Sequence, residues 1–316
     1  MFSFVDRCTV VLPTSARLVS KGKPVTESAE TAHQFGEGDR VSISLGYNGV
    51  LKNEFEGFVS RVNFTSPVQV ECEGYSWQLR QRTYLKTFVN TELVDVLEYL
   101  VQGTDIVLDK KNIPGFRIDK IVLQNHNGVE ALEELKKISN KTMSIFFTGN
   151  SMYAGLQYLN PKADVKYKMR WNVINDGNLK LKEAKNQDVI INYIGEKKDG
   201  TKVNVKIKNK IVSKDKVVVT SAKAGDSGET KIIKSHAVTD EATLMAMAQA
   251  KLQKLSFNGY EGKITTFGIP YCEPGYRAIL LDDKYTERSG NYLVESVEVT
   301  YGAQGFRRNV GIGLKL

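Results

Sequence analysis

Cysteine and histidine are scarce in this sequence, with three of each among 316 residues. The cysteines are odd in number and far apart along the chain: Cys8, Cys72 and Cys272. The histidines are equally scattered: His33, His126 and His236. A disulfide framework or a zinc site needs such residues in groups at short spacing. We therefore predict buried reduced thiols, no bound metal, and a protein that folds in the cytosol.

Long apolar runs and catalytic motifs are also missing. No stretch approaches the roughly 18 apolar residues that a membrane helix needs. The first residues lack the basic and apolar regions of a secretory signal. The sequence contains no Gly-x-Ser-x-Gly, no His-Glu-x-x-His and no Gly-Lys-Ser/Thr phosphate loop. From these absences we expect no catalytic residue, no cofactor-binding residue and no metal ligand.

Positive charge is concentrated in one segment. Residues 161–234 hold 18 Lys and Arg against 9 Asp and Glu, which more than accounts for the net charge of +8. Three interpretations are open for this lysine-rich segment: a solvated sheet face protected from aggregation, an electrostatic contact with an acidic partner subunit or an acidic channel, or nucleic-acid binding through phosphates. Lys206 and Lys208 alternate with Ile207, and no aromatic pair for base stacking is interleaved. This pattern weighs against nucleic acid.

Residues 1–83 are typical of a small antiparallel β-barrel. Residues 41–45 alternate between apolar and polar side chains, and Asn48-Gly49 suits a two-residue hairpin turn. A further strand at residues 68–73 places its apolar side chains on one face. We assign these residues to a first barrel domain.

Residues 84–165 have the pattern of an α+β insert domain. Helical spacing of apolar residues predicts helices at 92–100 and 129–139, the second beginning near Asn127. A strand is predicted at 143–147. The period of the pattern therefore changes between two β regions.

Strands return in residues 166–316, which we assign to a second β-barrel domain. A helix is predicted at 241–255, capped by Thr239 or Asp240, and we expect it to pack against this barrel. The predicted fold class is mainly β with α+β: two small antiparallel β-barrels flanking an α+β insert.

Short motifs at both ends of the chain resemble those of one family. In the first barrel they are Gly36-Glu37-Gly38-Asp39-Arg40-Val41, Phe55-Glu56-Gly57 and Glu71-Cys72-Glu73-Gly74-Tyr75. In the second they are Tyr260-Glu261-Gly262, Pro274-Gly275, Gly290-Asn291-Tyr292-Leu293-Val294 and Gly305-Phe306-Arg307-Arg308. Together they resemble the late control D, or baseplate hub, family of contractile-tailed phages and related injection systems.

The resemblance implies a structural protein without enzyme activity. Hubs of this family carry two barrels similar to tail-tube subunits, and three copies form a ring that adapts the sixfold tail tube to the threefold spike. The implied partners are a tail tube protein above, a separate spike protein below and other baseplate proteins, while nucleic acid only passes through the channel. The separate spike is expected because the sequence stops at Leu316, directly after the second barrel. The implied location is the tail baseplate of a phage or prophage particle assembled in the host cytoplasm.

Two alternatives belong to other functional classes. Glu71 and Glu73 share a strand face, as the carboxylates of a peptidoglycan-degrading enzyme could, and Asp282-Asp283 lies at a turn. We interpret the glutamates as a solvated or interface-facing strand surface, because the opposite face of that strand is apolar. The second alternative is a basic nucleic-acid-binding protein that uses the lysine-rich segment.

The terminal Arg-Arg pair has its own interpretation. We expect Phe306 to pack, and we expect Arg307 and Arg308 to pair with carboxylates on a neighbouring strand or subunit.

Overall fold

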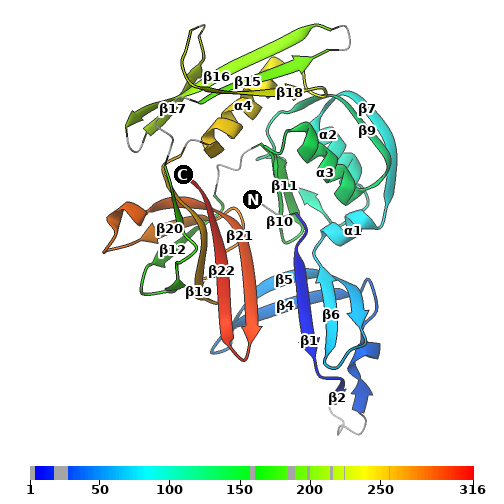
Figure 1. The fold of residues 1–316 in the computed structure, drawn as a ribbon. Coiled ribbons are helices and arrows are strands. Elements are labelled where there is room, and N and C mark those ends of the chain that lie inside the picture. The colour runs from blue at the N-terminus through cyan, green and yellow to red at the C-terminus, as the bar shows by residue number, and fades with distance from the viewer. Residues whose placement is uncertain are drawn as a thin grey trace.

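The computed structural model describes residues 4–17, 28–156, 161–183, 189–197, 200–213, 216–223, 225–255 and 257–316. The chain is mainly β, as predicted, and contains two curled half-barrel sheets. These sheets lie below a mixed body of strands and helices that includes both the insert and the lysine-rich segment (Figure 1).

The first curled sheet is antiparallel, with strand order β1-β6-β5-β4. Its strands are β1 (Arg7–Leu12), β4 (Arg40–Tyr47), β5 (Val50–Asn63) and β6 (Val68–Glu73). Asn48 and Gly49 both have positive φ and form the predicted hairpin turn between β4 and β5. Alternate residues of β6, including Val68, Val70 and Cys72, are buried in a small core.

The insert contains the two predicted helices. Asn127 and Glu130 form a capping box that begins α3, and Glu92 and Asp95 form another that begins α2. The strands β7 and β9 form a two-stranded ribbon, while β10, β11 and β8 form a small separate sheet. The bounds are α1 (Ser76–Arg80), β7 (Thr83–Glu92), α2 (Leu93–Val101), β8 (Val107–Leu108), β9 (Arg117–Asn127), α3 (Gly128–Ile138), β10 (Ser144–Thr148) and β11 (Ser151–Gly155).

The second curled sheet has seven strands in the order β12-β20-β21-β22-β19-β13, with β14 paired to β19. Parallel pairing joins β12 to β20, and the central strands β20, β21, β22 and β19 are antiparallel. The bounds are β12 (Asp164–Lys168), β13 (Val173–Asn175), β14 (Lys180–Lys182), β19 (Gly259–Phe267), β20 (Arg277–Leu281), β21 (Gly290–Gly302) and β22 (Gly305–Lys315).

The lysine-rich segment forms a sheet of its own, with strand order β17-β16-β15-β18. The bounds are β15 (Val189–Glu196), β16 (Lys202–Ser213), β17 (Lys216–Ser221) and β18 (Glu229–Ser235). Range 166–316 is therefore divided between this sheet and the second curled sheet.

Helix α4 (Glu241–Leu255) covers the lysine-rich sheet, not the second curled sheet. Asp240 begins the helix by accepting the backbone N–H of Thr243 at 2.8 Å. Leu244 and Met247 share a core with Ile191 of β15 and Val205 of β16, and that core continues into the insert. The expectation that this helix packs against the second barrel is wrong. The physical reason is that the apolar face of the lysine-rich sheet needs a cover, and the helix follows β18 directly.

Candidate assembly interface

The two curled sheets meet through a buried ion pair. Arg308 on β22 places Nη2 2.6 Å from Oε1 of Glu54 on β5, and the side chains are 1% and 6% exposed. The same guanidinium donates to the carbonyl oxygen of Gly268, at 3.0 Å from Nη2 and 3.2 Å from Nε, and to that of Cys272 at 3.4 Å. Because several acceptors surround the guanidinium, its charge is compensated without solvent. This contact ties a strand of the first sheet to a strand of the second.

An aromatic contact lies beside the ion pair. The ring of Tyr47 on β4 is 5.5 Å from that of Phe306 on β22, and the Tyr47 hydroxyl donates to the Phe306 carbonyl at 3.2 Å. Tyr301 also packs edge-on against Phe306, with ring centroids 6.1 Å apart. The hairpin tips leave Val50 and Tyr301 exposed next to this contact. Exposed apolar groups gathered at one place are typical of protein–protein contacts.

The terminal arginines take different roles. Phe306 is buried, as expected, and Arg308 pairs with Glu54. Arg307 instead donates to the Phe306 carbonyl at 3.0 Å and lies over the Phe267 ring at 5.4 Å. In the described part of the chain, the expected pairing with a carboxylate is thus found for one arginine of the two.

Three carboxylates gather where the chain passes between the insert and the first sheet. Phe4 belongs to the core of the insert, and β1 begins just after Asp6. The backbone carbonyl of Asp6 accepts the N–H of Gly74 at 2.9 Å. The segment before β1 therefore lies beside the segment that follows β6. Burial, followed by the charges of Glu273 and Glu73, raises the pKa of Asp6 to about 6. Ionised Asp6 is therefore unfavourable in the folded protein.

This raised pKa predicts a dependence of stability on pH. A carboxyl whose folded pKa exceeds its unfolded value binds its proton more tightly in the folded state. The contribution of Asp6 is complete below its ordinary value of 3.8 and is lost as the pH rises through about 6. The Asp6→Asn variant should raise the free energy of unfolding by about 3 kcal/mol at pH 7.5 and by only about 1 kcal/mol at pH 4.5. Urea unfolding at both pH values measures this, and an equal change at both would contradict the assignment.

The two glutamates considered for peptidoglycan cleavage have structural contacts. The Glu73 carboxylate is buried and accepts Arg80 Nε at 2.8 and 3.0 Å and the Ser76 hydroxyl at 2.7 Å. Glu71 accepts the side-chain amide of Asn63 on β5 at 2.6 Å. Of the two expected environments, solvated or interface-facing, the solvated one is therefore wrong for Glu73. Its position at the end of β6 allows α1, which follows at once, to fold back onto it.

Asp282 and Asp283 make different contacts. Asp282 is buried at the turn after β20 and accepts the backbone N–H groups of Lys284 and Tyr285 at 2.9 and 3.0 Å. Burial opposes its ionisation, but the hydrogen bonds from Arg170 and from these backbone groups lower its pKa. Asp283 forms an exposed ion pair with Lys168 at 2.9 Å. Both contacts shape the turn.

The histidines and cysteines form no metal site among the described residues. His33 contacts Glu30 at 3.1 Å, and His126 accepts the backbone N–H of Gln124 at 2.9 Å. The third histidine, His236, is exposed.

The cysteines are free thiols, but two of them are neighbours in space. Cys8 on β1 lies directly opposite Cys72 on β6, although 63 residues separate them in sequence. Burial raises the pKa of both thiols. Cys272 accepts the buried hydroxyl of Tyr167 at 3.1 Å. The sequence could not show the first pairing because strand register decides it.

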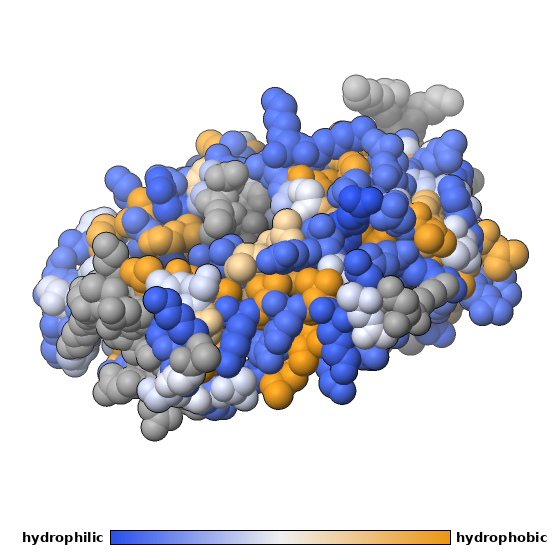
Figure 2. All heavy atoms as spheres, turned by 90° about the horizontal axis from the view of Figure 1, so that it is seen from above, coloured by the Kyte–Doolittle hydropathy of each residue, from blue (hydrophilic) through white to orange (hydrophobic). Residues whose placement is uncertain are grey.

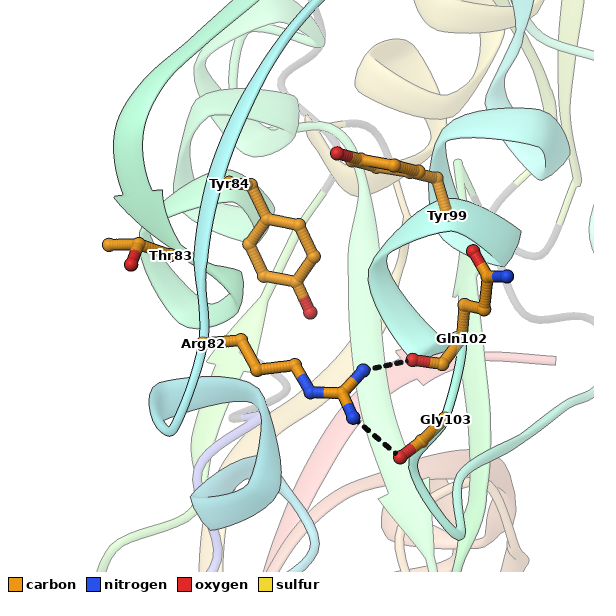
Figure 3. Close-up of a pocket in the computed structure, with 6 residues that line it drawn as sticks. All are labelled: Arg82, Thr83, Tyr84, Tyr99, Gln102 and Gly103. Carbon is orange, nitrogen blue, oxygen red and sulfur yellow. Dashed lines mark hydrogen bonds between the residues drawn. The ribbon is translucent and has the colours of Figure 1, made fainter.

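A hollow of about 510 Å³ lies at the C-terminal end of α2 (Figure 3). Arg82 reaches across it and donates to the carbonyl oxygens of Gln102 and Gly103, the latter at 3.0 Å. Tyr84 donates to the Leu100 carbonyl at 2.6 Å. These donors satisfy carbonyl groups that a helix end leaves open. The polar groups of the hollow therefore have a structural role in ending the helix.

The lysines singled out in the sequence lie on the lysine-rich sheet. Lys206 is exposed, and Lys208 pairs with Asp226 at 2.7 Å. None of the described helices is long and apolar enough to cross a membrane.

Comparison with known proteins finds likeness in structure but not in sequence. No family model matches the chain, and no curated protein matches it. The 43 kDa tail protein of prophage MuSo2 from Shewanella oneidensis is 12% identical with a TM-score of 0.54, over 98% of this chain and 88% of that one. The tail protein from Neisseria meningitidis MC58 is 12% identical with a TM-score of 0.55, over 98% of this chain and 97% of that one.

At this level of identity the likeness concerns the fold. It extends over nearly the whole chain and over most of each solved protein. The chain therefore has the fold of these two tail proteins, in line with the predicted resemblance to a family of phage tail proteins.

Proposed function

We propose that this chain is a structural protein of a phage or prophage tail, and that it serves as the baseplate hub. The observation that carries the proposal is the fold shared with two tail proteins over 98% of the chain. The sequence motifs of the hub family, placed in both curled sheets, support it independently. In this role the chain provides binding surfaces for other subunits and does not catalyse a reaction.

In this proposal three copies form a ring that adapts the sixfold tail tube to the threefold spike. Two curled sheets in each chain give six sheets per ring, which would match six tube subunits. The ion pair between Glu54 and Arg308 supports this arrangement, because it joins the two sheets of one chain. The partners would be a tail tube protein on one face of the ring and a separate spike protein on the other, with further baseplate proteins around it. The particle would assemble in the bacterial host cytoplasm.

Negative-stain electron microscopy of the purified protein tests this proposal. We expect rings with threefold symmetry and an open central channel. Closed twofold particles or open filaments would contradict the ring, because either one requires a different contact between copies.

A further inference from the structure

The lysine-rich sheet has one covered face and one open face. On the covered face, Tyr193 of β15 and Ile207 of β16 pack into the core that α4 completes. The open face lies on top of the molecule as drawn in Figure 1, and Figure 2 looks down on it. There, hydrophilic side chains stand between patches of hydrophobic surface.

Strand register defines the pattern of the open face. One row across three strands is Lys206, Asn192 and Ile232. The next row on the same face is Asn204, Ile194 and Lys234. Because the lysines stand at opposite ends of successive rows, Ile194 and Ile232 form a diagonal between Lys206 and Lys234. Ile232 is 62% exposed.

The two lysines of these rows supply positive charge, and the charge of Lys206 also acts on nearby Asp226. Lys206 and Lys234 are exposed, and neither has an ion-pair partner among the described residues. The nearby carboxylate of Asp226 is engaged by Lys208 at 2.7 Å. At the end of the sheet, Glu196 lies opposite Lys202 in register. The open face therefore combines two aliphatic side chains, Ile194 and Ile232, with the two exposed lysines Lys206 and Lys234.

Aliphatic side chains interleaved with charged ones are found at protein-docking surfaces. The aliphatic side chains offer little to a phosphate backbone, which is bound by dense Lys and Arg and by aromatic side chains that stack on bases. No arginine and no aromatic side chain lies in these two rows. Charge complementarity instead favours carboxylates placed around aliphatic side chains.

We propose that the open face of the lysine-rich sheet docks an acidic protein surface whose carboxylates surround exposed aliphatic side chains. Lys206 and Lys234 pair with the carboxylates, and the diagonal of Ile194 and Ile232 receives the aliphatic groups. The proposal goes beyond the ring, because it places a contact on a face outside the two curled sheets. Its failure and that of the ring can be told apart, since particle symmetry does not report on this face.

The probe is a fluorescent twelve-residue peptide of glutamates with two central leucines, titrated against the full chain at low salt and followed by fluorescence anisotropy. An all-glutamate peptide of equal length tests the need for aliphatic groups. A single-stranded oligonucleotide of similar charge tests the nucleic-acid alternative. We expect the leucine-containing peptide to bind tightest of the three.

Three variants locate the contact. The double variant Lys206→Glu with Lys234→Glu should weaken binding of the leucine peptide at least about tenfold. The Ile232→Ser variant should abolish the preference for the leucine peptide over the all-glutamate one. The matched control Lys52→Glu reverses the charge of an exposed lysine on the first sheet and should leave binding unchanged. All these side chains are exposed, so the fold should survive the changes.

The proposal is overturned by any of four results. These are no binding of the leucine peptide, unchanged binding in the double lysine variant, a preference for leucine that survives Ile232→Ser, and an oligonucleotide that binds as tightly as the leucine peptide. The last result would assign the face to nucleic acid.

Discussion

Replacing Glu54 by alanine should lower the free energy of unfolding by about 3–5 kcal/mol. The change leaves the Arg308 guanidinium buried with carbonyl acceptors but no opposite charge. Removing one partner of a buried pair costs far more than the net value of the pair, because the remaining charge stays desolvated. The measurement is urea unfolding at pH 7 followed by circular dichroism.

Two further variants separate this effect from a general loss of ion pairs. Asp164→Ala breaks a pair with Arg277 whose side chains are 43% and 40% exposed, and it should cost less than about 1 kcal/mol. The double variant Glu54→Leu with Arg308→Met should recover most of the stability, because it removes both charges and keeps the volume. A Glu54→Ala protein as stable as the Asp164→Ala protein would contradict the stabilising role of the buried ion pair between Glu54 and Arg308.

Replacing Gly262 by alanine should cost about 3 kcal/mol or more, through backbone strain and steric overlap together. Gly262 has a φ of +135°, and an added Cβ would lie 2.0 Å from the carbonyl oxygen of Asn178. Gly57, in the matching motif of the first sheet, would bring a Cβ 2.2 Å from the carbonyl oxygen of Glu73. Backbone cannot move aside as a flexible side chain can. Thermal and urea unfolding of the Gly262→Ala and Gly57→Ala variants measure the loss in the free energy of unfolding.

Gly302 is the control for these two glycines. It lies on β21, an added Cβ would meet nothing within 4 Å, and its φ is outside the left-handed region. Gly302→Ala should therefore change the free energy of unfolding by no more than about 0.5 kcal/mol. Equal costs at Gly262 and Gly302 would show that the close approach in the structure is not a constraint in solution.

The aromatic-Glu-Gly motifs show how far a sequence resemblance can reach. Both motifs are part of the family resemblance, and the structure gives each glycine a physical reason, because an added Cβ would overlap a backbone carbonyl oxygen. The hairpin at Asn48-Gly49 and the capping box at Asn127 were predictable because their signals are local. Alternating apolar residues likewise predicted the strands of the curled sheets.

The contacts between distant segments were not predictable. The sequence suggested that Arg308 would meet a carboxylate, but nothing local to Glu54, 254 positions earlier, identified it as the partner. The prediction of where helix α4 packs was wrong for a similar reason. Its apolar stripe showed that it must pack, while the choice between two sheets depended on which one lacked a cover. The burial of Glu73 was not predictable either, because Arg80 reaches it only after α1 folds back.

The native mass of the purified protein, measured by light scattering at tens of micromolar, tests the central claim most directly. The proposed ring of three copies predicts three times 35.3 kDa, or about 106 kDa. A single species of 35.3 kDa that persists when the tube and spike proteins of the same particle are added would contradict the account.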